Sequence, residues 1–247
     1  MIAQLRSEVY KWLTTRTHIG VLVSMVVLIM AAVLVHAFGL PVARLQTDDQ
    51  QYGILLDVGA NIGALFSALL GALCITSEFR TGTIRPTVLV RPRRPRVFAA
   101  KVVCSLAAGA IAGVLAAGSA VAGGWLGLTI RGVSVQVATG EVGRLLVGAL
   151  VGGALWAALG LAVGAIARSQ VPTVVGLVVW LLFVENLLAG DLPTAHQYTP
   201  GGLAQALAGS TRDAVLTSVP LAATLLLAYA AAGALLGAAA LSRRDVS

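Results

Sequence analysis

Long apolar segments constrain the fold of this chain more than any other feature of its sequence. Several run without a charged residue for more than the roughly 18 residues that separate a transmembrane helix from a buried helix of a soluble protein. The six segments, with boundaries set to within several residues, are 18–38, 58–77, 99–128, 145–167, 171–189 and 216–241. They are continuously apolar instead of alternating, and lipid requires the backbone to be paired internally, so helices are favoured over barrel strands. The sequence therefore predicts an all-α polytopic membrane protein, a single transmembrane domain of six helices.

The composition argues against other classes of protein. Charged residues make up 11% of the 247 residues and hydrophobic residues 58%, whereas a soluble domain carries roughly twice that charged share. The net charge of +7 could suggest nucleic-acid binding, but the basic residues lie in the breaks between apolar segments, as in membrane proteins. The first segment is too long for a signal peptide, so we predict a retained span. Cys74 and Cys104 are predicted to be free thiols.

The distribution of basic residues predicts the orientation of the spans. With the amino terminus inside, thirteen of the 17 Lys and Arg residues fall on the cytoplasmic side. They are Arg6, Lys11, Arg16, Arg80, Arg85, Arg91, Arg93, Arg94, Arg96, Lys101, Arg168, Arg243 and Arg244. The outer side holds Arg44, Arg131, Arg144 and Arg212. By the positive-inside rule both termini are cytoplasmic, and we expect the protein in the plasma membrane.

Residues 2–16 precede the first span and have an amphipathic helical pattern. The apolar side chains on one face are Ile2, Leu5, Val9, Trp12 and Leu13. Much of the remainder is occupied by Gln4, Arg6, Ser7, Glu8 and Lys11. This pattern indicates an interfacial helix on the inner leaflet, with Trp12 at the interface and basic residues such as Arg6 and Lys11 facing anionic lipid. The alternative is a charged anchor that only fixes topology.

The segment 78–98 between the second and third spans is predicted to be a cytoplasmic loop with an ordered turn. Glu78 and Arg80 end the second span, and Gly82 permits the backbone to turn away from the helix axis. Thr83 is positioned to cap a short helix that Pro86 interrupts or redirects. The basic run Arg91-Pro92-Arg93-Arg94-Pro95-Arg96 follows. From the residues alone two functions stay open: fixing topology and docking a cytoplasmic partner.

Glycines recur at helical spacing within the spans. The stripes are Gly59, Gly63, Ser67 and Gly71 in the second span, Gly148, Gly152, Gly160 and Gly164 around Trp156 in the fourth, and the pairs Gly109 with Gly113 and Gly233 with Gly237. Small residues four apart let helices pack closely. Two explanations stay open: packing within one bundle and a seam between two chains.

The sequence lacks the motifs of nucleotide binding and of intramembrane catalysis. Lys11 and Lys101 are its only lysines, and neither follows the glycine loop of a G-x-x-x-x-G-K-[ST] motif. It has no H-E-x-x-H, no aspartate pair at helical spacing and no convincing Ser/His arrangement. His196 and Asp191 alone do not make a metal site. We therefore expect a chain that is not an enzyme and carries no cofactor or metal of its own.

Few polar groups lie near the predicted membrane interior. Asp57 is at the outer start of the second span, and Glu185 and Asn186 are toward the outer end of the fifth. A charge in hydrocarbon faces a partner or a wet cavity. The alternative is that each of these groups lies at the interface, outside the lipid.

Several motifs, in their order around six spans, resemble a known family. They are the signature Glu78-Phe79-Arg80-Thr81-Gly82-Thr83-Ile84-Arg85 with the basic-proline turn after it, the run Val97-Phe98-Ala99-Ala100-Lys101, the opening Glu8 to Arg16, the turn Tyr198-Thr199-Pro200-Gly201-Gly202 and the ending Arg243-Arg244-Asp245-Val246. Together they are similar to permeases of the type-2 ABC exporter family, over essentially the whole chain. Better-known members carry a second acidic residue in the loop, where this chain has only Glu78.

The resemblance implies a fold, a partner and a pathway. Glu78 through Arg85 would form a coupling helix that docks on a separate cytoplasmic ATPase, which binds ATP and magnesium, and the 2–16 helix would support the same contact. Short helices just outside the membrane are implied within 190–215. Two copies, or this chain with a homologous permease, would enclose a central pathway. Its candidate residues, mainly from the second and fifth spans, are Asp57, Asn61, Ser67, Glu185 and Asn186.

The function implied by the resemblance is that of the membrane-spanning subunit of an ATP-driven exporter, as in multidrug efflux. The apolar, glycine-rich composition favours a hydrophobic or amphipathic cargo such as a drug, an antibiotic or a lipid. An ion-coupled secondary transporter or channel is the alternative. Such proteins bury ionisable groups at mid-membrane or break their helices there, whereas these spans have apolar centres apart from glycines.

Overall fold

A computed structural model of the chain describes residues 2–46, 51, 58–83, 94–208 and 216–243. All regular secondary structure within these residues is helical, which confirms the predicted all-α class. In chain order the elements are α1 (Ile2–Thr14), α2 (Arg16–Gly39), α3 (Val42–Leu45), α5 (Val58–Thr81), α7 (Arg94–Ile130), α8 (Thr139–Ala167), α9 (Gln170–Val179), η2 (Trp180–Val184), α10 (Glu185–Asp191), α11 (Pro193–His196), α12 (Pro200–Ala208) and α13 (Val219–Arg243).

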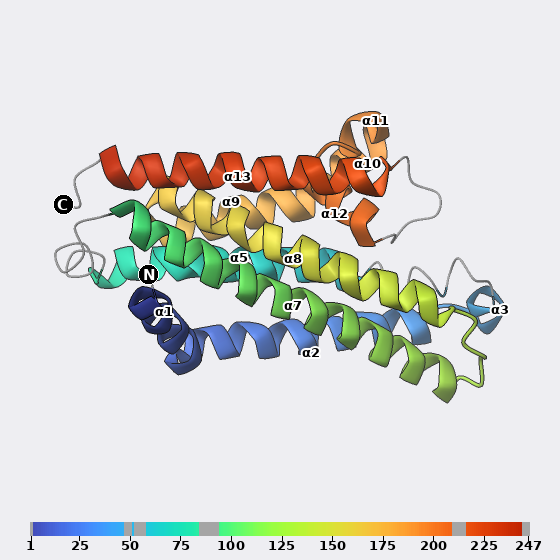
Figure 1. Cartoon of the computed structure of the whole chain (residues 1–247). Coiled ribbons are helices and arrows are strands. Elements are labelled where there is room, and N and C mark those ends of the chain that lie inside the picture. Colours follow the sequence, from blue (N-terminus) through green and yellow to red (C-terminus); the bar gives the residue numbers. More distant parts are fainter. Residues whose placement is uncertain (1, 47–50, 52–57, 84–93, 209–215, 244–247) are drawn as a thin grey trace.

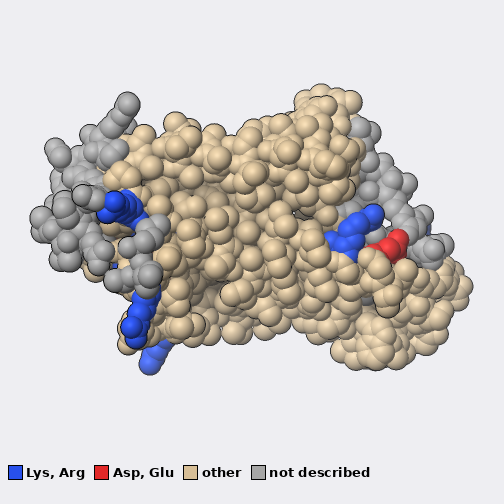
Figure 2. All heavy atoms as spheres, viewed as in Figure 1, with Lys and Arg blue, Asp and Glu red and all other residues tan. Residues whose placement is uncertain are grey.

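Six helices in the described ranges are long and apolar enough to cross a membrane, as the sequence predicts. They are Arg16–Gly39, Val58–Thr81, Pro95–Ile130, Thr139–Ala167, Gln170–Asp191 and Val219–Leu241. On the face drawn in Figure 2, the coloured charged side chains lie toward the two ends of the molecule, and the belt between them is free of charge. The chain is therefore a multi-pass membrane protein.

The spans run alternately in opposite directions along one bundle (Figure 1). As a result, α1 and the last turn of α13 lie at the same end, which we call the α1 end. The opposite end, where α3 and the short helices α11 and α12 lie, is called the α12 end.

The third span extends beyond the predicted segment 99–128. α7 begins at Arg94 and ends at Ile130, and its 37 residues correspond to about 55 Å at 1.5 Å per residue. The hydrocarbon core of a bilayer is only about 30 Å thick. The apolar pattern identified the lipid-embedded part of this helix but not its first turns, which contain arginines. α8 likewise begins at Thr139, before the predicted 145.

α8 lies in the middle of the bundle and packs against α5, α7 and α13. Glycines make these contacts close. A Cβ on Gly71 of α5 would overlap the backbone carbonyl of Ala157 in α8, and a Cβ on Gly160 of α8 would overlap the carbonyl of Ala68 in α5. Other close approaches are Gly59 and Gly63 to Ala116, Gly109 to Gly153, Gly113 to Ala149, Gly233 to Ala162 and Gly237 to Phe98. Packing within one bundle therefore accounts for most glycines of the stripes, although Gly152 makes no such close approach.

Three spans are only lightly covered by the rest of the chain. For each span we compare the share of its most apolar stretch that is buried by the rest of the chain. This share is 22% in α2, 22% in Gln170–Asp191 and 17% in α13, whereas it is 61% in α5 and 56% in α8. The three lightly covered spans present most of their surface to lipid or to another chain.

The fourth and fifth spans are joined by a tight hairpin, and the fifth span is not a uniform α-helix. Arg168 ends α8 in the left-handed region with φ of 54°, and α9 begins at Gln170. Residues 180–184 (η2) form a π-helical turn between α9 and α10. Such turns hold an extra residue and are frequent at functional sites. The short helices α11 and α12 follow within the range 190–215, of which 209–215 lies outside the described residues.

Candidate functional site

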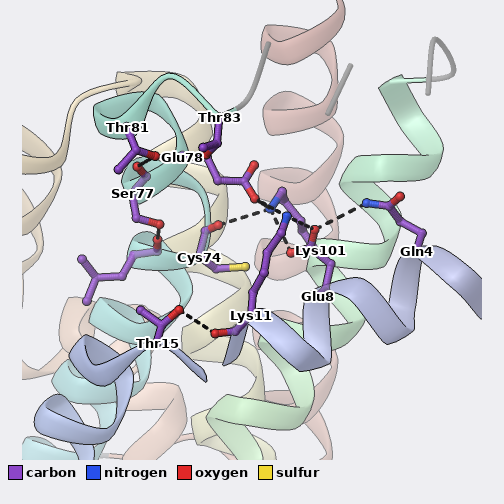
Figure 3. Close-up of polar contacts among 11 residues, drawn as sticks. Gln4, Glu8, Lys11, Thr15, Cys74, Ser77, Glu78, Thr81, Thr83 and Lys101 are labelled. Atoms are coloured by element: carbon purple, nitrogen blue, oxygen red, sulfur yellow. Dashed lines mark hydrogen bonds and ion pairs between the residues drawn. The ribbon is translucent and has the colours of Figure 1, made fainter. Parts of the chain in front are cut away.

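Four charged side chains from three helices meet at the α1 end. Glu8 and Lys11 come from α1, Glu78 from the last turn of α5 and Lys101 from the early turns of α7. Figure 3 shows their charged groups pointing toward one another. Glu8 and Lys11 share a face of α1 because they are three residues apart. We call these four residues the ion cluster, and it contains both lysines of the chain.

Lys101 occupies the centre of the ion cluster, and 0% of its side chain is exposed. Its Nζ donates to Glu8 Oε2 at 2.9 Å, to Glu78 Oε1 at 2.7 Å and to the carbonyl oxygen of Cys74 at 3.3 Å. An ammonium group has three N–H donors. Each donor of Lys101 therefore has its own acceptor, two of which are carboxylates.

Lys11 joins the same two carboxylates from the side of α1. Its Nζ donates to Glu8 Oε1 at 3.0 Å and to Glu78 Oε1 at 2.7 Å. Gln4 adds a longer hydrogen bond to Glu8 Oε1 at 3.4 Å. With two carboxylates and two ammonium groups, the ion cluster is neutral as a whole.

Burial makes this arrangement sensitive to the loss of any member. The side chain of Glu8 is 1% exposed and that of Glu78 is 7% exposed. Removing an ion from water costs several kcal/mol, which is recovered only where the ion is paired and hydrogen-bonded. Both ammonium groups of the ion cluster are paired with carboxylates and hydrogen-bonded to them. These contacts also hold α1 against α5 and α7.

Lys11 lies outside the spans, and its surroundings keep it charged. Burial and the neighbouring Lys101 ammonium lower the pKa of Lys11, but the hydrogen bond to Glu78 and the charges of Glu78 and Glu8 outweigh them. On balance the pKa of Lys11 is raised above its ordinary value of 10.5.

The stability contributed by Lys11 is expected to be constant near neutral pH and to be lost in alkali. A group whose pKa is raised on folding contributes fully below its unfolded pKa, here 10.5, and the contribution disappears as the pH rises through the folded value. Because 40% of the side chain is exposed, solvent screening limits the contribution to about 1 kcal/mol. The difference in unfolding midpoint between the wild type and Lys11→Met in detergent measures it. A difference that already shrank between about pH 7 and pH 9 would contradict this expectation.

The signature residues divide into a buried and an exposed part. Glu78 is buried in the ion cluster, while Phe79 is half-buried, with the guanidinium carbon of Arg168 5.7 Å from its ring centre. The exposed residues are Arg80, Thr81, Gly82 and Thr83. The predicted turn is confirmed, since α5 ends at Thr81 and Gly82 has a φ of 71° in the left-handed region. Outside the described residues lie Ile84, Arg85, Pro86 and the run 91–93.

The helix predicted near the amino terminus exists as α1, and part of its apolar face is exposed. Val9 is 49% exposed and Leu13 is 72% exposed, which suits contact with lipid. Arg6 is also exposed, while Leu5 and Trp12 are partly buried. These residues agree with an interfacial helix.

The predicted polar face of α1 differs from the structure at Lys11 and Glu8. The sequence pattern predicts that Lys11 faces lipid, but its ammonium donates a hydrogen bond to Glu78, and Glu8 is buried in the bundle. The physical reason is Lys101, a charge inside an apolar segment that requires a partner. That residue, the third of the predicted segment 99–128, was also the sequence signal that could have revealed the ion cluster.

A second polar group surrounds Glu185 at the α12 end. Glu185 is 5% exposed. Its Oε1 accepts from Trp180 Nε1 at 2.8 Å and from the Gly201 amide at 2.9 Å. Its Oε2 accepts from Thr199 Oγ1 at 2.6 Å and lies 3.3 Å from His196 Nε2. Glu185 is thus buried among protein groups, and it fastens α10 to α11 and α12.

Part of the candidate pathway borders a small cavity at the α12 end. The cavity has a volume of about 100 Å³. The candidate residues that border it are Asn61, Glu185 and Asn186. Gln205 also borders it and donates to Asn61 Oδ1 at 3.2 Å. Ser67 is fully buried away from this cavity, and Asp57 lies outside the described residues. The volume is well below the roughly 300–1,000 Å³ of drug-sized sites.

At the α1 end, the ion cluster links the three helices α1, α5 and α7 through ion pairs and hydrogen bonds. Cys74 and Cys104 are free. Within the described ranges, no group of three or more His, Cys, Asp or Glu side chains could hold a metal ion. No protein-family model and no curated protein matches this chain.

Proposed function

We propose that this chain is the membrane-spanning permease subunit of an ATP-driven exporter, and that the ion cluster couples it to a separate ATPase. The observation that carries the proposal is the position of the cluster. It joins the end of α5 to the start of α7, the two helices connected by residues 82–93, and it joins both to α1. A displacement applied to this connection would reach three helices together, as rigid-body switching requires.

The exposed part of the signature is the proposed docking surface. It consists of Arg80, Thr81, Gly82 and Thr83 at the tip of α5. Glu78 has a different role in this scheme, because its buried carboxylate holds α5 in position instead of contacting the partner. The excess of basic residues supports a cytoplasmic α1 end, where such an ATPase would bind. ATP and magnesium are assigned to the partner, because the chain has no phosphate-binding lysine motif.

A second copy of this chain, or a homologous permease, is proposed to complete the pathway. The light coverage of α2, Gln170–Asp191 and α13 leaves surface for that contact. The cavity of about 100 Å³ that the candidate pathway residues border at the α12 end is too small for a drug-sized cargo, which also supports a pathway shared between two chains. The proposed cargo is hydrophobic or amphipathic and is moved outward.

Neutralising Arg80 is expected to weaken ATPase binding without unfolding the chain. Arg80 is exposed and takes no part in the ion cluster, so Arg80→Gln removes only a surface charge. We expect about tenfold less ATPase to remain bound, which corresponds to the loss of one favourable charged contact. The tagged chain is purified from membranes of its native cells, and the bound ATP hydrolysis and recovered partner protein are measured per amount of chain.

The matched control is Arg44→Gln, which neutralises an exposed arginine of α3 at the opposite, α12 end. This variant should retain wild-type ATPase binding. Two results would favour the ion-coupled alternative over this proposal. One is that no ATPase copurifies with the wild-type chain, and the other is that the purified chain alone transports cargo under an ion gradient.

A further inference from the structure

A cavity of about 410 Å³ lies beside the ion cluster at the α1 end. Its volume falls within the range of about 300–1,000 Å³ that is typical of small-molecule sites. It is bordered by α1, the start of α2, the end of α5 and the start of α9. The charged residues described in its wall are Glu8, Lys11, Glu78 and Arg80.

Several buried polar atoms in this wall have no hydrogen-bond partner among the described residues. They include two acceptors, Glu78 Oε2 and Gln170 Oε1, and one donor, Trp12 Nε1. His18 Nδ1, in a buried residue, is a fourth such atom. The side chain of Glu78 is itself only 7% exposed. Because buried polar atoms are nearly always paired, a group of them around one cavity indicates a ligand.

The unpaired atoms define the chemistry of that ligand. A carboxylate oxygen and a carboxamide oxygen both accept from N–H groups, and an ammonium group satisfies both at once. The indole N–H of Trp12 requires an acceptor oxygen. The wall also carries two cationic and two anionic side chains, which suits a ligand with both charges. Ethanolamine phosphate, with an ammonium and a phosphate on one short chain, combines these features.

The position of the cavity favours a lipid headgroup. The neighbouring helix α1 exposes Val9, Tyr10 and Leu13, at 49%, 69% and 72%. A helix with such an exposed apolar face lies at the boundary between headgroups and acyl chains. The cavity beneath it is therefore at the depth where phospholipid headgroups occur.

We propose that this cavity binds the headgroup of an aminophospholipid, with the ammonium on Glu78 Oε2 and Gln170 Oε1 and the phosphate on Trp12 Nε1. The lipid fills the space between α1 and the spans, and it stabilises α1 in its position on the ion cluster. This site goes beyond transport and requires no ATPase, so its test is independent of the proposed function.

Binding is tested with the purified full-length chain in phosphatidylcholine nanodiscs that contain a minor share of phosphatidylethanolamine or of its N-methylated forms. The lipids retained on the chain are counted by native mass spectrometry, and the unfolding midpoint is recorded. We expect roughly tenfold preferential retention of phosphatidylethanolamine over phosphatidylcholine. The preference should decrease with each added methyl group, because a quaternary ammonium has no N–H to donate. Equal retention of the two lipids would overturn the proposal.

Two variants probe the site without altering the ion cluster. Gln170→Ala removes an acceptor of the ammonium and is expected to reduce the preference for phosphatidylethanolamine by about threefold to tenfold. Trp12→Phe removes the donor to the phosphate, which both lipids carry, and is expected to reduce the retention of both lipids by about threefold to tenfold. The matched controls are Gln46→Ala and Trp125→Phe, both exposed at the α12 end, and they should keep the wild-type preference and retention. A full preference in Gln170→Ala, or unchanged lipid retention in Trp12→Phe, would also overturn the proposal.

Two soluble probes distinguish the lipid from other amines. Dodecylamine, which lacks a phosphate, should compete poorly with phosphatidylethanolamine. If it competes equally well, the assignment of the phosphate to Trp12 is wrong. Soluble O-phosphoethanolamine should also compete poorly, because it has no acyl chains to hold it at the interface; equal competition would replace the lipid with a soluble ligand.

Discussion

Lys101→Met is expected to destabilise the folded chain by about 3–5 kcal/mol, the cost of leaving buried charge without its partner. Methionine keeps much of the side-chain volume, but it removes the ammonium between Glu8 and Glu78, whose side chains are 1% and 7% exposed. Lys11 already bonds to both carboxylates and cannot balance two negative charges. The effect should be several times that of Lys11→Met, because Lys101 is fully buried whereas Lys11 is 40% exposed.

Unfolding in detergent, followed by helical signal against denaturant, measures this free energy. Combining Lys101→Met with Glu8→Gln leaves one ammonium, Lys11, facing one carboxylate, Glu78, and should recover much of the loss. Arg96→Met, at an exposed position near the start of α7, is the control and should change stability by no more than about 0.5 kcal/mol. If Lys101→Met proved as stable as the wild type, Lys101 would have to be solvated instead of buried.

Gly71→Ala is expected to cost about 1–3 kcal/mol by overpacking the contact between α5 and α8. The added Cβ would overlap the carbonyl oxygen of Ala157, a backbone atom that cannot move aside unless the two helices separate. Gly160→Ala should act similarly, because its Cβ would meet the carbonyl of Ala68 from the opposite side. Since both glycines belong to one interface, the double variant should lose less than the sum of the two.

Gly118→Ala is the matched control for the glycine contacts. Gly118 lies within α7, and a Cβ there would have nothing within 4 Å. Its replacement should leave stability unchanged or raise it by up to about 1 kcal/mol, the difference in helix propensity between the two residues. A Gly71→Ala chain that stayed fully stable but lost association with a second copy would favour a seam between chains over packing within one.

The spans and their breaks could be predicted from the sequence because apolar length is a local property. The first predicted segment, 18–38, corresponds closely to α2. The end of the second span was predictable from Gly82, whose backbone adopts the left-handed conformation that glycine tolerates. The hairpin at residues 168–170 was predictable from its shortness and polarity.

The ion cluster could not be predicted because it depends on contacts between distant residues. Lys101 is 93 positions from Glu8 and 23 from Glu78, and no local pattern shows which ions will meet. The same limit applies to Glu185. Its partner Gly201 lies in α12, and its partner Thr199 lies in the turn just before that helix. Amphipathicity placed Glu8 with the polar residues of α1 but could not show that the polar side faces a buried ammonium.

The π-helical turn at residues 180–184 sets the direction, around the helix axis, in which the later side chains of the fifth span point. In an α-helix each residue advances the chain by about 100° around the axis. One additional residue in a turn therefore rotates the next segment by about that angle relative to a straight continuation of α9. Glu185 is the first residue after the turn, and in this phase its carboxylate reaches Thr199 and Gly201. The one extra residue of the π-helical turn thus orients the carboxylate that links α10 to the short helices at the α12 end.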